Sequence, residues 1–426
     1  MMEANILMSF TSLAMAPITA PMAPGLSALW PSVHLAAGVI NGPVLTAFIA
    51  CIGLNVLVAL RLLRPGTVDA DPSVGGPPTA RRVGLGHIAR ATSAIALLTL
   101  VECLALGLLL DLHPFGMVHL VWLNVTLVIP VCGVSLLLAG LRGRTVSVPA
   151  RLVACLSLLS MPLAYVALFV TPYDLRVEHV TFTVPTERAG SEPIVLGILA
   201  DLQTTAIGPH EVAAVDALLA GEPDIILLPG DVFQGPKDLF EEVLPEFQTL
   251  LSRLQAPGGV FLVPGNTDYR AGLPRLFEGS GVRLLEDETV RIDYKDRTLS
   301  IFGANERNVA SGPWVENEAL PDFEHAPGDD DIRIVLSHRP RIVTELATDT
   351  RVDLVIGAHT HGGQVSLPFL GPPLVLSPLP YSIAAGGLHE LEGRWVYISR
   401  GVGMERGQAP PIRLLVPPEV NFVTLE

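Results

Sequence analysis

Long apolar stretches dominate the first 175 residues of the chain. Four of them are long enough to cross a bilayer as helices, at roughly 42–63, 92–110, 117–140 and 152–171. An earlier apolar stretch, 5–30, is interrupted by prolines and leaves three alternatives open: an extra span, a re-entrant segment or a misassigned start. It lacks the basic segment of a signal peptide. We therefore expect a helical transmembrane domain over residues 1–175.

The remaining residues, 176–426, show a different pattern. Short apolar runs that favour strands recur at 194–200, 224–229, 259–264, 298–303, 332–337, 352–356, 395–399 and 421–425. Apolar positions at helical spacing predict helices over 210–221 and 237–254, and a short helix is expected from Pro340 to Leu346. Strands that alternate with helices indicate an α/β domain with a mixed sheet.

The placement of arginines predicts the orientation of this domain. The link over 61–90 carries five arginines and the link over 141–151 carries three, whereas the short link 111–116 carries none. Positively charged links stay in the cytoplasm, so the short link is expected outside. The last span then exits on the far side, which places 176–426 outside the cytoplasm of a multi-pass membrane protein.

The net charge of −15 comes from the C-terminal half, because residues 1–175 hold eight arginines against six acidic residues. An acidic domain lacks the basic face that non-specific nucleic-acid binding requires, so no nucleic-acid partner is expected. An anionic substrate remains compatible, since bound cations would dominate the local field. All four cysteines precede residue 156, so the domain over 176–426 is expected to fold without disulfides.

Six polar side chains follow the predicted strands: Asp201, Asp231, Asn266, His338, His359 and His361. Side chains at strand ends gather at the rim of a sheet. Two carboxylates, one carboxamide and three imidazoles are enough donors for two divalent cations. Two cations about 3.5–4 Å apart are a standard device for hydrolysing phosphate esters.

Two local features sharpen this hypothesis. Gly230 permits a tight turn that exposes Asp231, and we expect that carboxylate to bridge the two cations. His359 and His361 flank a single residue. In an extended segment residues two apart point to the same side, so both imidazoles are expected to face one site.

The series of motifs resembles that of the calcineurin-like metallophosphoesterase superfamily, which is D-x-H, G-D, G-N-H-D/E, a lone H and G-H-x-H. The string AHTHGGQ at 358–364 and the tail at 397–420 resemble its membrane-associated bacterial branch. The resemblance covers about 195–426 and implies two packed mixed β-sheets flanked by helices, with two divalent cations (Mn, Fe or Zn) at the strand ends. By position, it assigns Asp201, Gln203, Asp231 and His361 to one cation and Asp231, Asn266, His338 and His359 to the other.

Two positions depart from the family pattern. Gln203 stands where the family has histidine, and its amide oxygen is a poorer ligand, which favours Mn²⁺ over Zn²⁺. Thr267 stands where the family has the histidine that assists the leaving group, and losing proton transfer costs about 10²–10⁴ in rate. His210, at the start of the 210–221 helix, is a candidate for the missing acid.

The sequence thus predicts a membrane-anchored, metal-dependent hydrolase of phosphomonoesters, phosphodiesters or pyrophosphates. A hydroxide held between the two cations would attack phosphorus in line. Location at the outer membrane face adds lipid-linked phosphates to the expected substrates. The alternative is a catalytically degraded domain that binds a ligand or signals without turnover.

Overall fold

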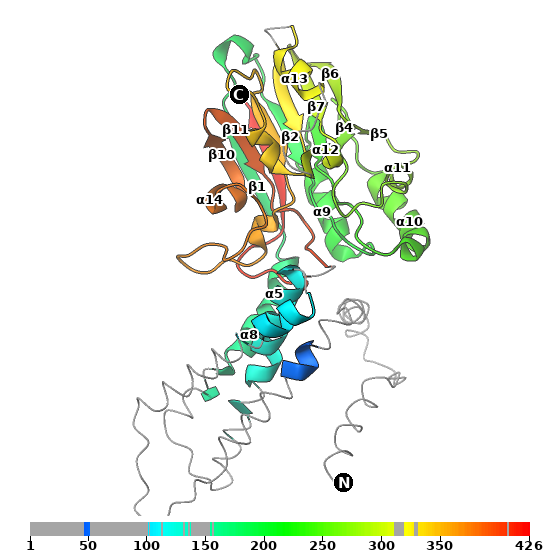
Figure 1. Ribbon diagram of the computed structural model, residues 1–426. Helices are drawn as coiled ribbons and strands as arrows, with labels where there is room; N and C mark the ends of the chain where they lie inside the picture. The colour runs from blue at the N-terminus through cyan, green and yellow to red at the C-terminus, as the bar shows by residue number, and fades with distance from the viewer. Residues whose placement is uncertain are drawn as a thin grey trace, which may run out of the picture. The chain divides into compact units, whose positions relative to one another are not determined.

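The computed structural model describes residues 47–51, 101, 103–111, 114–130, 133–134, 137, 154–155, 157–310, 319–327, 331–406 and 409–426. Within them lie two six-stranded sheets with helices on their outer faces, preceded by shorter helical segments (Figure 1). The stretch 5–30 and much of the four expected spans lie outside the described residues.

Among the described residues, helical segments at 47–51 and 103–109 are followed by two longer helical runs that precede the sheets. One comprises α5 (Pro114–Leu123) and the π-helical turn η1 (Asn124–Val128); the other comprises α8 (Ser160–Tyr165), the π-helical turn η2 (Val166–Val170) and the 3₁₀ turn η3 (Thr171–Tyr173). Among the described residues, none of the helices combines the length and the apolar character that crossing a bilayer needs. The division into a transmembrane domain over 1–175 and a second domain over 176–426 therefore stays a prediction.

Sheet 1 contains six strands in the order β1 (Arg176–Phe182), β12 (Glu419–Leu425), β2 (Ile194–Ile198), β3 (Ile225–Leu228), β4 (Val260–Leu262) and β5 (Val282–Leu284). Neighbouring strands are parallel except β12 and β2, which are antiparallel. The carboxyl ends of β2, β3 and β4 therefore meet at one edge of the sheet.

Sheet 2 contains six strands in the order β10 (Gly387–Leu391), β11 (Arg394–Ile398), β9 (Leu354–Gly357), β8 (Ile332–Leu336), β7 (Arg297–Gly303) and β6 (Glu288–Tyr294). Its two outer pairs are antiparallel and its three inner pairs are parallel. Both sheets are mixed, which confirms the predicted fold class for this domain.

Apolar side chains fill the space between the sheets, where Leu196 and Leu227 of sheet 1 share a buried cluster with Ile334 and Ile356 of sheet 2. Helices cover both outer faces (Figure 1). Sheet 1 is covered by α9 (Pro209–Ala220), α10 (Lys237–Leu251) and α11 (Leu273–Leu276). Sheet 2 is covered by α12 (Glu306–Ala310), α13 (Ala319–His325), η5 (Pro340–Thr344) and α14 (Tyr381–Ala384). A short turn, η4 (Thr186–Arg188), follows β1. Strands packed on both faces hold their end loops in fixed positions.

Candidate metal centre

The candidate ligands follow strands that are neighbours in the two sheets. Asp201, Asp231 and Asn266 come after β2, β3 and β4, and His338 and His359 come after β8 and β9. Parallel neighbours deliver the loops that follow them to the same edge. The two edges meet, because the backbone N–H of His359 donates to Asp201 Oδ2 at 3.1 Å across 158 residues of sequence.

His338 lies at the centre of the cluster. Its Nε2 lies 2.9 Å from Asn266 Oδ1, 3.4 Å from Asp231 Oδ2 and 3.1 Å from His359 Nδ1. Its Nδ1 lies 3.7 Å from Asp201 Oδ1. Asp201, Asp231 and His338 each offer a ligand atom within 4.8 Å of the others. Atoms at this spacing can surround one cation.

The second ring nitrogen of His338 fixes its tautomer. Nδ1 lies 2.8 Å from the carbonyl oxygen of Pro229, which can only accept, so Nδ1 carries the proton. Nε2 and Asn266 Oδ1 are then two acceptors facing each other at 2.9 Å, an arrangement that a cation would stabilise. Burial lowers the pKa of His338, so the imidazole is neutral, which is the form that binds metals.

Five of the candidate residues adopt the left-handed backbone conformation that non-glycine residues rarely take. Their φ angles are 46° at Asp201, 35° at Gln203, 52° at Asp231, 69° at His359 and 47° at His361. Such positions cost on the order of 1–3 kcal/mol each and cluster at functional sites. The surrounding packing therefore holds these side chains in place against a local backbone preference.

The prediction that His359 and His361 lie in an extended segment is wrong. Both lie in the turn after β9, where His361 begins the 3₁₀ turn η6 (His361–Gly363). Two glycines with positive φ close this turn, and Gly362 N donates to the Thr360 hydroxyl at 3.3 Å. His361 still reaches the cluster, since its Nδ1 lies 3.8 Å from Asp201 Oδ2.

Two glycines allow the loops after β3 and β4 to touch. A Cβ on Gly265 would lie 2.0 Å from Asp231 Oδ1, and a Cβ on Gly230 would lie 2.5 Å from Gly265 N. Asp268 joins the same loops, because its carboxylate accepts from the backbone N–H groups of Gly265, Asp231 and Val232 at 2.8, 3.0 and 2.8 Å. Burial raises the pKa of Asp268 to about 6.

The central carboxylates are buried and destabilised as anions. Asp201 and Asp231 are 0% and 1% exposed. Burial raises the pKa of Asp231 to about 7, although hydrogen bonds from Thr267 oppose the shift. Burial, with the nearby charge of Asp231, raises the pKa of Asp201 well above its ordinary value. Bound cations would favour the ionised forms and remove this penalty.

Two buried oxygen atoms at the cluster have no hydrogen-bond donor among the described residues: Asp201 Oδ1 and Gln203 Oε1. The Gln203 amide nitrogen donates to Glu405 Oε2 at 3.2 Å, which leaves the amide oxygen for another partner. A buried acceptor without a partner is costly. The donor set, rich in oxygen, therefore fits divalent cations.

The two residues considered for the leaving-group proton lie differently. Thr267 N donates to Asp231 Oδ1 at 2.8 Å and its hydroxyl donates to Phe233 O at 3.4 Å, so this residue orients Asp231. His210 Nε2 lies 3.1 Å from Val402 O, and burial lowers the pKa of this histidine. His210 is not among the described residues that line the cavity of the site, and its catalytic role stays a prediction.

Three charged residues beside the site were not predicted. Arg413 is fully buried and donates to the carbonyl oxygens of Arg400, Gly401 and Gly403, next to Asp201. Arg339 Nη1 lies 3.0 Å from His359 Nε2. Glu405 accepts from Gln203, as described above. Arg339 directly follows the candidate ligand His338, whereas Glu405 and Arg413 lie in the part of the chain to which only the similarity of the tail at 397–420 pointed.

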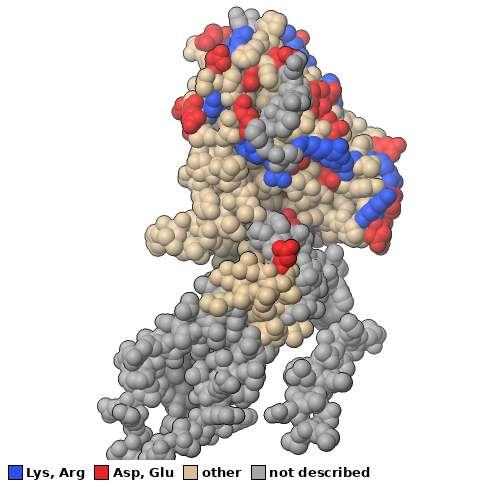
Figure 2. Space-filling view, in the orientation of Figure 1, with Lys and Arg blue, Asp and Glu red and all other residues tan. Residues whose placement is uncertain are grey.

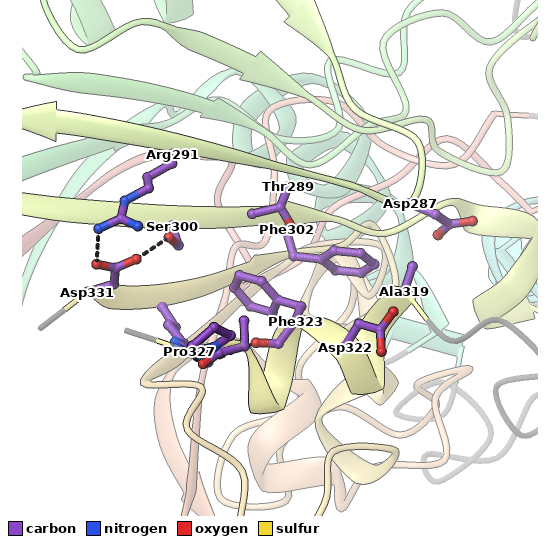
Figure 3. A pocket seen from close by; sticks show the side chains of 12 residues that line it. Asp287, Thr289, Arg291, Ser300, Phe302, Ala319, Asp322, Phe323, Pro327 and Asp331 are labelled. Carbon is purple, nitrogen blue, oxygen red and sulfur yellow. Dashed lines mark hydrogen bonds and ion pairs between the residues drawn. The ribbon is translucent and has the colours of Figure 1, made fainter. Parts of the chain in front are cut away.

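The candidate ligands open into a cavity of about 450 Å³. Its polar end is formed by Gln203, Asp231, Asn266, His359 and His361. A second cavity, of about 400 Å³, lies beside β6, β7 and α13 (Figure 3). There Asp331 accepts from Arg291 Nη2 at 3.0 Å and from Ser300 Oγ at 2.8 Å. These polar groups satisfy one another, so we place the chemistry in the first cavity.

Comparison with known proteins agrees with this geometry. Residues 195–363 match the family model described as calcineurin-like phosphoesterase. An uncharacterized metallophosphoesterase of Aquifex aeolicus (strain VF5) is 31% identical, with 60% of this chain and 93% of that protein covered. The uncharacterized metallophosphoesterase YkuE of Bacillus subtilis (strain 168) is 30% identical, with 54% and 73% covered. The phosphodiesterase YaeI of Escherichia coli (strain K12) is 28% identical, with 55% and 82% covered.

Proposed function

The chain belongs to the calcineurin-like phosphoesterases, metal-dependent hydrolases of phosphate esters, and we propose that the cluster around His338 is its catalytic metal centre. The observation that carries this proposal is the pair of buried oxygens without donors, Asp201 Oδ1 and Gln203 Oε1, beside a neutral imidazole. Divalent cations held there would lower the pKa of a bound water and offset the charge of the phosphate oxygens.

The residues divide into ligands and residues that position them. We assign one cation to Asp231, Asn266, His338 and His359, and the other to Asp201, Gln203, Asp231 and His361. Thr267 N and the Asp268 carboxylate hold Asp231 and the two loops in register. Oxygen donors outnumber nitrogen donors at the second position, which favours Mn²⁺.

Thr267 determines which esters suit the site. Its hydroxyl donates a hydrogen bond to a backbone carbonyl and is too weak an acid to protonate a leaving group at neutral pH. The departing oxygen must then take its proton from water. Substrates whose leaving group is a weak base, such as phosphoanhydrides and aryl esters, are least affected by that loss.

The test uses the full-length protein with Mn²⁺ and bis-p-nitrophenyl phosphate. We expect turnover that falls by about 10³-fold or more in Asp231→Ala, because both cations lose a ligand. Glu246→Ala, at an exposed position of α10, serves as the matched surface control. Turnover no higher than that of Asp231→Ala would end the proposal.

A second candidate function is a ligand-binding module without turnover, which Thr267 and Gln203 favour because both replace imidazoles of the family pattern. Calorimetry on the Mn²⁺-loaded protein separates the two. Tight binding of a phosphate ester that is recovered intact would support the binding module over the enzyme.

We also propose that residues 1–175 anchor the protein in a membrane with 176–426 on the outer side. The arginine-rich links over 61–90 and 141–151 support this orientation. Glu246→Cys should then react in intact cells with a maleimide that cannot cross membranes, and Ser73→Cys, in the first link, should react only after lysis. The opposite labelling pattern would reverse the orientation.

A further inference from the structure

One wall of the cavity at the candidate metal centre is apolar and comes from outside the two sheets. Val118, Val121, Trp122 and Val125 of α5 and η1 line it. These positions recur at helical spacing, so they form one face of the helix. Val121 and Val125 are 38% and 39% exposed, so packing within the protein does not cover these two side chains.

The facing wall comes from loops of the two-sheet domain. Leu374 and Leu376 lie after η6, and Ile412 and Leu414 lie before β12; all four line the cavity. The cavity is therefore polar around the candidate ligands, where Thr360, Gln364 and Glu405 also line it, and apolar along these two walls. A ligand that fills this cavity needs a polar group at one end and an apolar part along the rest.

Direct contacts join the helical runs to the loops of the site. Arg413 N donates to Ala167 O of η2 at 3.0 Å, and the buried guanidinium of the same arginine lies next to Asp201. Tyr173 of η3 packs edge-on against His210, with ring centroids 5.5 Å apart. The element α8 in turn packs against η1. These contacts place the apolar wall beside the candidate ligands.

The loop over 366–376 ends in an apolar tip. Phe369 and Leu370 are 106% and 81% exposed, at a turn in which Leu367 N donates to Gly371 O at 2.9 Å. The loop projects from the domain, and its surface carries no charged side chain (Figure 1 and Figure 2). Exposed phenylalanine and leucine at a loop tip are unfavourable in water and are typical of a segment that enters a lipid phase.

We propose that the site takes a phosphate ester that carries a hydrocarbon chain, with the phosphate at the candidate metal centre and the chain along the apolar wall. This inference rests on the proposed function, because the same ligands receive the phosphate. A bilayer lipid and a soluble amphiphile share this chemistry. Each buried methylene strengthens binding by about fourfold, a gain that a small polar ester lacks.

The first measurement compares alkyl 4-nitrophenyl phosphate diesters, from methyl to octyl, with the full-length Mn²⁺-loaded protein. We expect kcat/KM to rise by about 30-fold or more from methyl to octyl. A second readout needs no turnover: calorimetry with methylphosphonate and octylphosphonate should show the same preference in affinity.

Substitutions at two leucines of similar exposure test whether the apolar wall binds the hydrocarbon chain. Leu374 is 36% exposed and lines the cavity, whereas Leu367 is 38% exposed, lies in the same loop and is not among the described lining residues. Leu374→Gln combined with Leu376→Gln should lower the octyl-to-methyl ratio to below about fivefold. Leu367→Gln should keep the wild-type ratio.

The outcomes separate this inference from the proposed function. Turnover of bis-p-nitrophenyl phosphate without any dependence on chain length, in rate or in phosphonate affinity, would overturn the inference and leave the enzyme intact. If phosphonate affinity depended on chain length but no ester were hydrolysed, the proposed catalytic function would be wrong. The inferred ligand class would still be supported. An unchanged octyl-to-methyl ratio in the double variant would also overturn the assigned wall.

Phe369→Ser distinguishes the two sources of the ligand. If the chain comes from a bilayer, this variant should hydrolyse a long-chain 4-nitrophenyl phosphate ester in vesicles at least about fivefold more slowly, with the soluble octyl ester unaffected. If Phe369→Ser and the wild-type protein hydrolysed both the vesicle substrate and the soluble ester at equal rates, the natural ligand would be a soluble amphiphile.

Discussion

Gln203 presents a buried amide oxygen where an imidazole nitrogen would be the stronger ligand. Its amide nitrogen is already engaged by Glu405 at 3.2 Å, and its backbone has a φ of 35°. The side chain is therefore fixed by its surroundings and needs no rearrangement to meet a cation. At the scale of a single residue, we propose that this position sets the strength and the selectivity of cation binding in one half of the site.

Replacing this amide by an imidazole should strengthen the site. We expect Gln203→His to tighten the weaker cation by about tenfold or more and to shift preference from Mn²⁺ toward Zn²⁺, as measured by calorimetry and metal analysis. Gln234→His is the matched control, since Gln234 bonds the same Glu405 at 2.7 Å without being a candidate ligand. Equal gains in both variants would exclude Gln203 as a ligand.

Thr267 offers the complementary experiment on catalysis. Thr267→His should raise kcat for a phenyl phosphate ester by about 10- to 10²-fold, because it restores a proton donor, and should change the 4-nitrophenyl ester little. Thr267→Ser should leave both rates near wild type. Equal acceleration of the two esters would contradict a role in protonating the leaving group.

The proposed ligand set was accessible from sequence because its members lie within a few residues of the end of an apolar run. The positioning roles of Asp268 and Arg413 were not, although Asp268 is the last residue of the G-N-H-D/E pattern. Asp268 acts through four backbone N–H groups from two loops, and Arg413 acts through backbone carbonyls. Contacts with the backbone leave no partner side chain in the sequence, so no residue pattern marks them.

At the scale of elements, Asp224 links the two sheets at the start of β3. Its carboxylate accepts from Val195 N at 2.8 Å, from the Tyr294 hydroxyl at 2.8 Å and from Lys295 Nζ at 3.0 Å. Burial alone would raise the pKa of Asp224, but these hydrogen bonds outweigh it and lower the pKa. The ionised carboxylate therefore stabilises the junction of β2, β3 and the β6–β7 hairpin.

Asp224→Asn should lower the free energy of unfolding by about 1–2 kcal/mol at pH 7. The pKa is lower in the folded state than in the unfolded state, so this stabilisation is present above the unfolded pKa and is lost as pH falls through the folded pKa. Urea titrations should show the deficit at pH 7 shrinking toward zero below about pH 3.

A surface ion pair supplies the control for this experiment. Asp216 pairs with Arg253, but its side chain is 55% exposed, so Asp216→Asn should cost less than about 0.5 kcal/mol. A deficit at Asp224 that did not change with pH would show that shape, rather than charge, matters at this junction.

The strands differ in how far their sequences reveal them. All eight predicted runs correspond to strands, since most of their positions are buried and apolar. The edge strands β1, β6 and β10 escaped prediction, because β1 is largely exposed and because β6 and β10 mix partly buried or exposed positions with charged residues. The three residues of β5 give too short a pattern.

For the whole molecule, cations should act as structural ligands of the folded state. Removing them with EDTA should lower the melting temperature, because ionised Asp201 and Asp231 lose their counter-charge. Mn²⁺ at about 100 times its Kd should restore about 2.7 kcal/mol. Asp231→Ala should lose most of this response in a calorimetric scan, and a full response in that variant would place the bound cation elsewhere.

The contacts between the helical runs and the loops of the site could not be predicted from the sequence. The apolar stretch over 117–140 carries a signal for burial, but apolar packing is not directional and names no partner. The contact between Arg413 N and Ala167 O uses only backbone atoms, so the sequence gives no sign of it. Only the folded chain shows that residues of this stretch line the cavity of the site.

Strand β12 lies between β1 and β2, so β1 reaches sheet 1 only through the segment from Glu419 to Leu425. During synthesis, this sheet stays incomplete until residue 425 has left the ribosome. The loop carrying Arg413, which supports Asp201, also emerges late. A premature stop codon anywhere upstream of β12 would therefore release a chain that cannot close its first sheet.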